Sequence, residues 1–72
     1  MTEYQKAMLK VAKVAIADLL GYSEPPEGQQ DNYPFNAIAW KNSLPVEWQK
    51  DADRVIAHVY HHETIPEFCI IP

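Results

Sequence analysis

The chain has 72 residues, 47% of them apolar, and a formal net charge of −4. This length and composition predict one folded domain and exclude a disordered tail, and apolar runs of only a few residues exclude a membrane span. An acidic chain is a poor default binder of nucleic acid, so nucleic acid is not the expected partner.

We expect a cytoplasmic protein. The lysines near the N-terminus alternate with apolar residues instead of preceding the separate hydrophobic block that a signal peptide requires. The single cysteine, Cys69, cannot form an internal disulfide, and a free thiol fits a reducing compartment.

Residues 2–20 are predicted to form the first helix. Thr2 and Gln5 have the spacing of a capping box, and Gly21 stands where a left-handed residue commonly ends a helix. Apolar residues recur at helical spacing and make one stripe, consisting of Tyr4, Met8, Val11, Ala15 and Leu19.

Residues 21–33, with the sequence GYSEPPEGQQDNY, are predicted to form an acidic loop. Two prolines and two glycines exclude regular structure, and Glu24, Glu27 and Asp31 give the segment a charge of −3. In a small domain, a loop of this length either carries function or acts as a spacer that swings the chain across the core. The sequence leaves both interpretations open.

A short helix is predicted over residues 34–42. Pro34 fits its first turn, where the missing N–H has no helical acceptor. Phe35, Ile38 and Ala39 are spaced to share one face, and Trp40 flanks them.

A second long helix is predicted over residues 44–62. Pro45 fits its first turn, and Ser43 is the expected cap. Its apolar stripe consists of Leu44, Trp48, Ala52, Val55 and Val59.

Together these elements predict an all-α domain of three helices, in which the two long helices are antiparallel and the short helix completes the core. Residues 63–72, ETIPEFCIIP, are predicted to be an extended C-terminal tail, because no second strand is evident with which they could form a sheet. The tail either lies in a groove between helices or pairs with the same tail of a second chain.

No arrangement of residues predicts catalysis, so we expect a protein that is not an enzyme and needs no cofactor. His58 and His62 have the spacing of zinc ligands on a helix, with Glu63 and Cys69 nearby. This ligand set is incomplete, and the helix dipole alone favours histidines in a last turn, so no metal site is predicted.

We therefore predict a small non-catalytic protein-interaction module. Aromatic side chains beside carboxylates suit a protein partner with a basic surface. Small size and surplus apolar surface predict a homodimer, and small size with acidity would suit an accessory or inhibitor protein of a phage or mobile element. The predicted partner-binding residues are Glu24, Glu27, Asp31, Tyr33 and Trp40.

The alternative is a nucleic-acid-binding regulator. Lys6, Lys10 and Lys13 lie together on one side of the first helix, where they could contact phosphates. The segment AIAWKNSLPVEW resembles the end of the recognition helix in phage Cro-type repressors, and IADLLGYS would then take the place of the preceding helix. This resemblance implies a degenerate helix-turn-helix. The chain departs from that family in its loop from Glu24 to Tyr33 and lacks the Gln, Ser and Arg side chains that read base edges.

Overall fold

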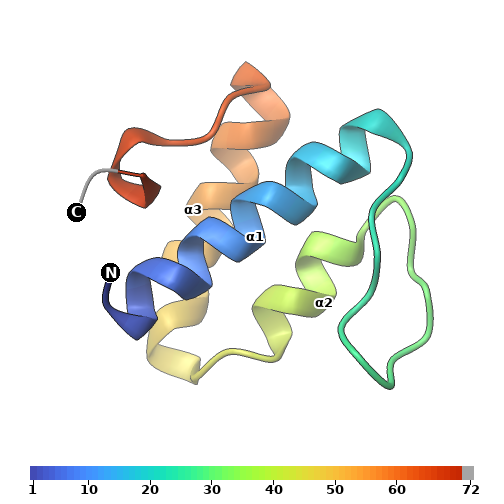
Figure 1. Ribbon diagram of the computed structural model, residues 1–72, viewed down its shortest axis with the longest axis horizontal. Helices are drawn as coiled ribbons and strands as arrows, with labels where there is room; N and C mark the ends of the chain where they lie inside the picture. The colour runs from blue at the N-terminus through green and yellow to red at the C-terminus, as the bar shows by residue number, and fades with distance from the viewer. Residues whose placement is uncertain (71–72) are drawn as a thin grey trace.

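Three α helices carry the fold. The computed structural model describes residues 1–70, and in this range it contains α1 (Glu3–Leu20), α2 (Asn36–Asn42), α3 (Val46–His62) and a final 3-10 turn, η1 (Glu67–Cys69), with no strand (Figure 1). Each α helix packs against the other two, and η1 packs against α1. The predicted all-α, three-helix fold is confirmed.

Local signals fix both ends of α1. The hydroxyl of Thr2 accepts a hydrogen bond from the backbone N–H of Gln5 at 3.0 Å. At the other end Gly21 has φ 88°, and its N–H donates to the carbonyl of Ala17 at 2.8 Å. Glycine adopts this left-handed conformation at little cost, so the helix ends where the sequence predicts.

The other two helices begin two residues later than predicted. The N–H of Phe35 donates to the carbonyl of Asn32 at 2.7 Å, which forms a separate turn ahead of α2. The N–H of Leu44 donates to the carbonyl of Lys41 at 2.9 Å, so this residue closes the last turn of α2 instead of opening α3. Ser43, predicted to cap the N-terminus of α3, is instead the C-terminal cap of α2, and no side-chain hydrogen bond caps the N-terminus of α3.

The two long helices run in the same direction, which corrects the predicted antiparallel arrangement. Near their starts, the hydroxyl of Tyr4 donates to Asp51 Oδ2 at 2.5 Å, and near their ends the hydroxyl of Tyr60 donates to Asp18 Oδ2 at 3.0 Å. The reason is that α2 runs back along α1, beginning beside the end of α1, where the N–H of Ala37 donates to Asp18. Because α2 reverses the direction of the chain, α3 runs in the same general direction as α1 (Figure 1).

The hydrophobic core lies where α1 crosses α3. Tyr4 and Trp48 cover one end of it, with ring centroids 5.5 Å apart and ring planes at 85°. Trp48, a member of the predicted apolar stripe, packs against the core but is only partly buried in that position. The apolar side chains that are at most 1% exposed come from all four elements and are Met8, Val11, Ala12, Ala15, Ala37, Ala52, Val55, Val59 and Cys69.

The C-terminal segment packs back onto its own chain. Glu63 ends α3 in a left-handed conformation with φ 56°, and Cys69 is fully buried against the core. The predicted extended tail is corrected in part, because hydrogen bonds from the N–H groups of Cys69 and Ile70 to the carbonyls of Pro66 and Glu67 wind it into η1. The end of that predicted tail, residues 71–72, lies outside the described residues.

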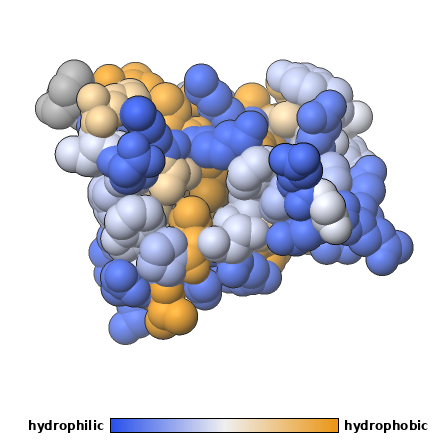
Figure 2. Space-filling model, turned by 60° about the horizontal axis from the view of Figure 1, so that its bottom comes forward, coloured by the Kyte–Doolittle hydropathy of each residue, from blue (hydrophilic) through white to orange (hydrophobic). Residues whose placement is uncertain are grey.

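The surface is unevenly polar. In the face shown in Figure 2, hydrophilic residues dominate and hydrophobic residues form separate patches between them. Several large apolar side chains are indeed exposed, and some of them lie beside one another around the loop after α1. None of the described helices combines the length and apolarity that a membrane crossing requires.

Candidate functional site

A buried asparagine holds the loop between α1 and α2 in place. Asn36, the first residue of α2, is fully buried, and its Nδ2 donates to Ser23 Oγ and to Asp31 Oδ1, both at 2.9 Å. Its Oδ1 accepts the backbone N–H of Asn32 at 2.8 Å. One amide therefore ties the two ends of the loop to each other and to the helix.

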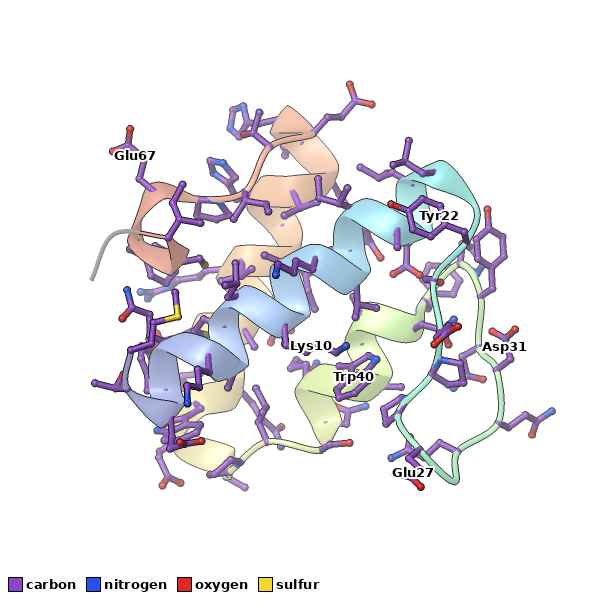
Figure 3. The ribbon with its side chains drawn as sticks, viewed as in Figure 1. Lys10, Tyr22, Glu27, Asp31, Trp40 and Glu67 are labelled. Carbon is purple, nitrogen blue, oxygen red and sulfur yellow. The ribbon has the colours of Figure 1, made fainter. Side chains whose placement is uncertain are left out.

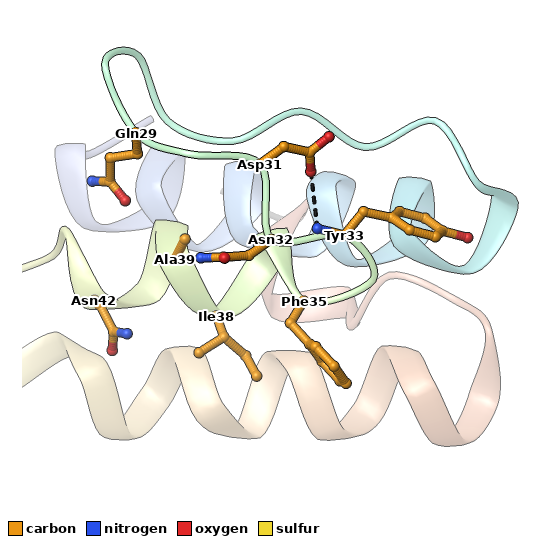
Figure 4. A pocket seen from close by; sticks show the side chains of 8 residues that line it. All are labelled: Gln29, Asp31, Asn32, Tyr33, Phe35, Ile38, Ala39 and Asn42. Carbon is orange, nitrogen blue, oxygen red and sulfur yellow. Dashed lines mark hydrogen bonds between the residues drawn. The ribbon is translucent and has the colours of Figure 1, made fainter.

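Asp31 is fixed by two donors on one of its oxygens. Besides the bond from Asn36, Oδ1 accepts the backbone N–H of Tyr33 at 2.9 Å (Figure 4). These hydrogen bonds, the one from Asn36 first, hold the pKa of the Asp31 carboxyl below its usual range. Both bonds use the same oxygen, so neither occupies Oδ2 of this exposed residue.

Apolar side chains stand beside this carboxylate. Tyr33, Phe35 and Ile38 are 50%, 54% and 36% exposed, although each is large and apolar. They line an open pocket of about 490 Å³ together with Asp31, and Phe35 and Ile38 point to the same side of α2 (Figure 4). We call Asp31, Tyr33, Phe35 and Ile38 the loop–α2 surface.

The exposure of Phe35 and Ile38 was not predicted. Of the predicted face of Phe35, Ile38 and Ala39 only Ala39 is buried, and the residues that α2 buries are Asn36, Ala37 and Ala39. Two of these are alanines, and small side chains let α2 lie close to α1, against which it packs. The signal in the sequence was the pair of alanines, because small residues favour the side of a short helix that lies against a neighbour.

The five predicted partner-binding residues do not form one patch. Asp31 and Tyr33 belong to the loop–α2 surface, whereas Glu24 and Trp40 line a different pocket of about 310 Å³ beside α1. Glu27 lies at the far turn of the loop, away from Trp40 (Figure 3), and lines neither of these two pockets.

Trp40 is held by its own chain. Its indole Nε1 donates to the carbonyl of Glu24 at 2.9 Å, and the ammonium of Lys10 lies 4.6 Å from the ring centroid. A cation over an aromatic face is an attractive contact. Lys10 and Trp40 are therefore seen side by side between α1 and α2 (Figure 3).

Two of the three lysines behind the nucleic-acid alternative contact other side chains of the chain. Lys6 lies 3.7 Å from Glu3, and Lys10 lies over Trp40. The two helices that would form a Cro-type helix-turn-helix, α1 and α2, are joined by residues 21–35, a connection far longer than the turn of three or four residues in that motif.

A third pocket is lined by a buried carboxylate. Asp18 is 4% exposed, and its Oδ2 accepts the N–H of Ala37 and the hydroxyl of Tyr60, both at 3.0 Å. Its Oδ1 is buried and has no hydrogen-bond partner. The pocket, of about 200 Å³, is lined by Asp18, Leu19, Pro34, Phe35 and Tyr60. Burial, followed by the bond to the Asp18 carboxylate, raises the pKa of the Tyr60 hydroxyl.

His58 and His62 lie close together near the end of α3, whereas Cys69 is buried in η1. The rings of His58 and His62 are 4.7 Å apart, but no group of three or more potential metal ligands occurs among residues 1–70. Burial raises the pKa of the Cys69 thiol, which keeps it from forming the reactive thiolate.

Comparison of the chain with protein-family models, with curated proteins and with solved structures finds no match.

We predict that Asn36→Ala loosens the loop and destabilises the fold. The change removes three hydrogen bonds and leaves the N–H of Asn32 without its acceptor, so we expect a loss of about 1–3 kcal/mol in the free energy of unfolding. Chemical denaturation measures this loss, and hydrogen exchange should quicken at the amide of Asn32. Asn42→Ala, an exposed change at the other end of the same helix, is the control.

The same variant should also raise the pKa of the Asp31 carboxyl, as followed by NMR. In the native protein the lowered pKa means that its hydrogen bonds stabilise the loop at neutral pH, and that this contribution disappears as the pH falls through the lowered value. An unchanged pKa in Asn36→Ala, with unchanged exchange at Asn32, would contradict the role given to Asn36.

Proposed function

We propose that the protein is a small non-catalytic interaction module that binds a protein partner through the loop–α2 surface. The observation that carries this proposal is the exposure of Tyr33, Phe35 and Ile38 around one pocket. Isolated exposed apolar residues are common on protein surfaces, but adjacent ones around a hollow are typical of interaction sites.

The surface is held in shape before any partner arrives. The hydrogen bonds of Asn36 with Ser23, Asn32 and Asp31 fix the loop, so little conformational entropy is lost in ordering it when a partner binds. A preorganised patch with rigid aromatic side chains is the kind of surface that yields strong contacts from a small area.

Charge indicates what kind of partner fits. Asp31 lines the same pocket as the apolar side chains, and the whole loop of residues 21–33 carries a charge of −3. A partner segment with an apolar side chain next to a basic one would complement both features. The loop's field would also speed the approach of such a partner at low ionic strength.

We predict that Phe35→Ser and Ile38→Ser abolish capture of the partner without unfolding the protein. Both side chains are exposed, so the melting temperature should change little, whereas the interface would lose its apolar contact. Affinity purification from the native host, with quantitative mass spectrometry of wild type and variants, measures capture.

Val46→Ser is the matched control for that experiment. Val46 is 79% exposed at the start of α3 and lies outside the loop–α2 surface. We expect one protein to be recovered with wild type and with Val46→Ser but lost with Phe35→Ser. Recovery of the same set of proteins with all three would discard the loop–α2 surface as the binding site.

We also propose that the chain self-associates as a homodimer at micromolar concentration. Exposed apolar side chains that are distant from the loop–α2 surface, including Met1, Phe68 and Ile70, support this proposal. Sedimentation equilibrium over a range of concentrations should show a mass approaching twice 8.3 kDa. A constant monomer mass up to the highest soluble concentration would refute it.

A further inference from the structure

The carboxylate of Asp18 is buried without a cation. Among residues 1–70 the ion pairs are Lys6 with Glu3 and Lys41 with Asp53, and neither reaches Asp18, which is 4% exposed. A buried carboxylate is costly unless hydrogen bonds and an opposite charge compensate it.

The available hydrogen bonds compensate only one of its two oxygens. The N–H of Ala37, in the first turn of α2, and the hydroxyl of Tyr60 both donate to Oδ2. Oδ1 has no partner and is shielded from water by the surrounding side chains. The site therefore lacks one hydrogen-bond donor, and a donor that carries positive charge would satisfy it best.

The pocket that Asp18 lines is otherwise apolar and aromatic. Its walls are Leu19, Pro34, Phe35 and Tyr60, and its volume of about 200 Å³ is that of several water molecules. A small hydrated ammonium would lose its water against such walls. A guanidinium is flat, more weakly hydrated and able to stack on aromatic rings while its N–H groups reach a carboxylate.

We propose that this pocket receives the guanidinium of an arginine side chain, which donates to Oδ1 of Asp18 between the rings of Phe35 and Tyr60. Leu19 and Phe35, which are 42% and 54% exposed, are the wall side chains with room to turn aside and admit it.

The pocket adjoins the loop–α2 surface. Phe35 lines both this pocket and the larger one beside Tyr33 and Ile38, so a single partner segment could cover both. Assigning the arginine to a partner protein rests on the proposed function, whereas the preference of the pocket for a guanidinium does not. The negative loop nearby would favour a basic segment in either case.

The test uses two probes that differ in charge but hardly in shape, Nα-acetyl-arginine amide and the neutral Nα-acetyl-citrulline amide. Each is titrated into the isotopically labelled protein at matched ionic strength, and backbone amide shifts are followed by NMR. One side chain supplies only weak affinity, so the titration extends to about 50 mM. Wild type should show saturable shifts at Leu19, Phe35 and Ala37 with the arginine probe only.

Two variants and one control locate the binding. Asp18→Asn and Phe35→Ala should each weaken the arginine probe, Asp18→Asn by about tenfold because a charge-assisted hydrogen bond is lost. Glu47→Gln removes an exposed carboxylate at the start of α3, outside the pocket, and should leave the affinity unchanged. If Asp18→Asn does not fold, Phe35→Ala decides, since its side chain is exposed.

The proposal is overturned if wild type shows no saturable shift, if the citrulline probe binds equally well, or if the folded variants bind as wild type does. Such a failure leaves the capture experiment with Phe35→Ser and Val46→Ser standing on its own. Conversely, the pocket could bind the arginine probe while the variants of the loop–α2 surface capture the same proteins as wild type. That result would support guanidinium binding by the pocket and contradict partner binding through the loop–α2 surface.

Discussion

One carboxylate joins the three helices of this protein. Asp18 lies near the end of α1, accepts the N–H of Ala37 in the first turn of α2, and accepts the hydroxyl of Tyr60 near the end of α3. The positive end of a helix dipole favours a negative charge at that place. The direction of α3 relative to α1 follows from this junction, and the loop–α2 surface is built directly upon it.

A second buried polar group gives the surface its shape. Asn36 stands one residue before Ala37 and fastens the loop on its other side. Because Asn36 and Ala37 fill the inner side of α2, the bulky Phe35 and Ile38 are left outside. The exposed apolar patch is thus a consequence of the hydrogen bonds that bury Asn36. The same hydrogen bonds would hold the patch in a fixed shape for a partner.

The sequence predicted the elements better than it predicted their arrangement. Periodicity and the signals at Thr2 and Gly21 located α1 closely, since these interactions are local. The direction of α3 and the exposure of Phe35 depend on contacts between residues far apart in the chain, such as Asp18 with Tyr60. The acidic loop was found from composition. Composition does not reveal the hydrogen bonds that hold Asp31 by its carboxylate and Glu24 by its backbone carbonyl, so it could not predict that the two residues line different pockets.

The contact between Asp18 and Tyr60 joins the end of α1 to the end of α3, and a double-mutant cycle with Asp18→Asn and Tyr60→Phe measures this coupling directly by chemical denaturation. Residues in contact should give losses in the free energy of unfolding that fail to add by about 1 kcal/mol or more. A parallel cycle of Asp18→Asn with Tyr4→Phe, at the other end of α1, should be additive. If the Asp18 and Tyr60 losses also add to within about 0.5 kcal/mol, the two helices are not joined there and the account is contradicted.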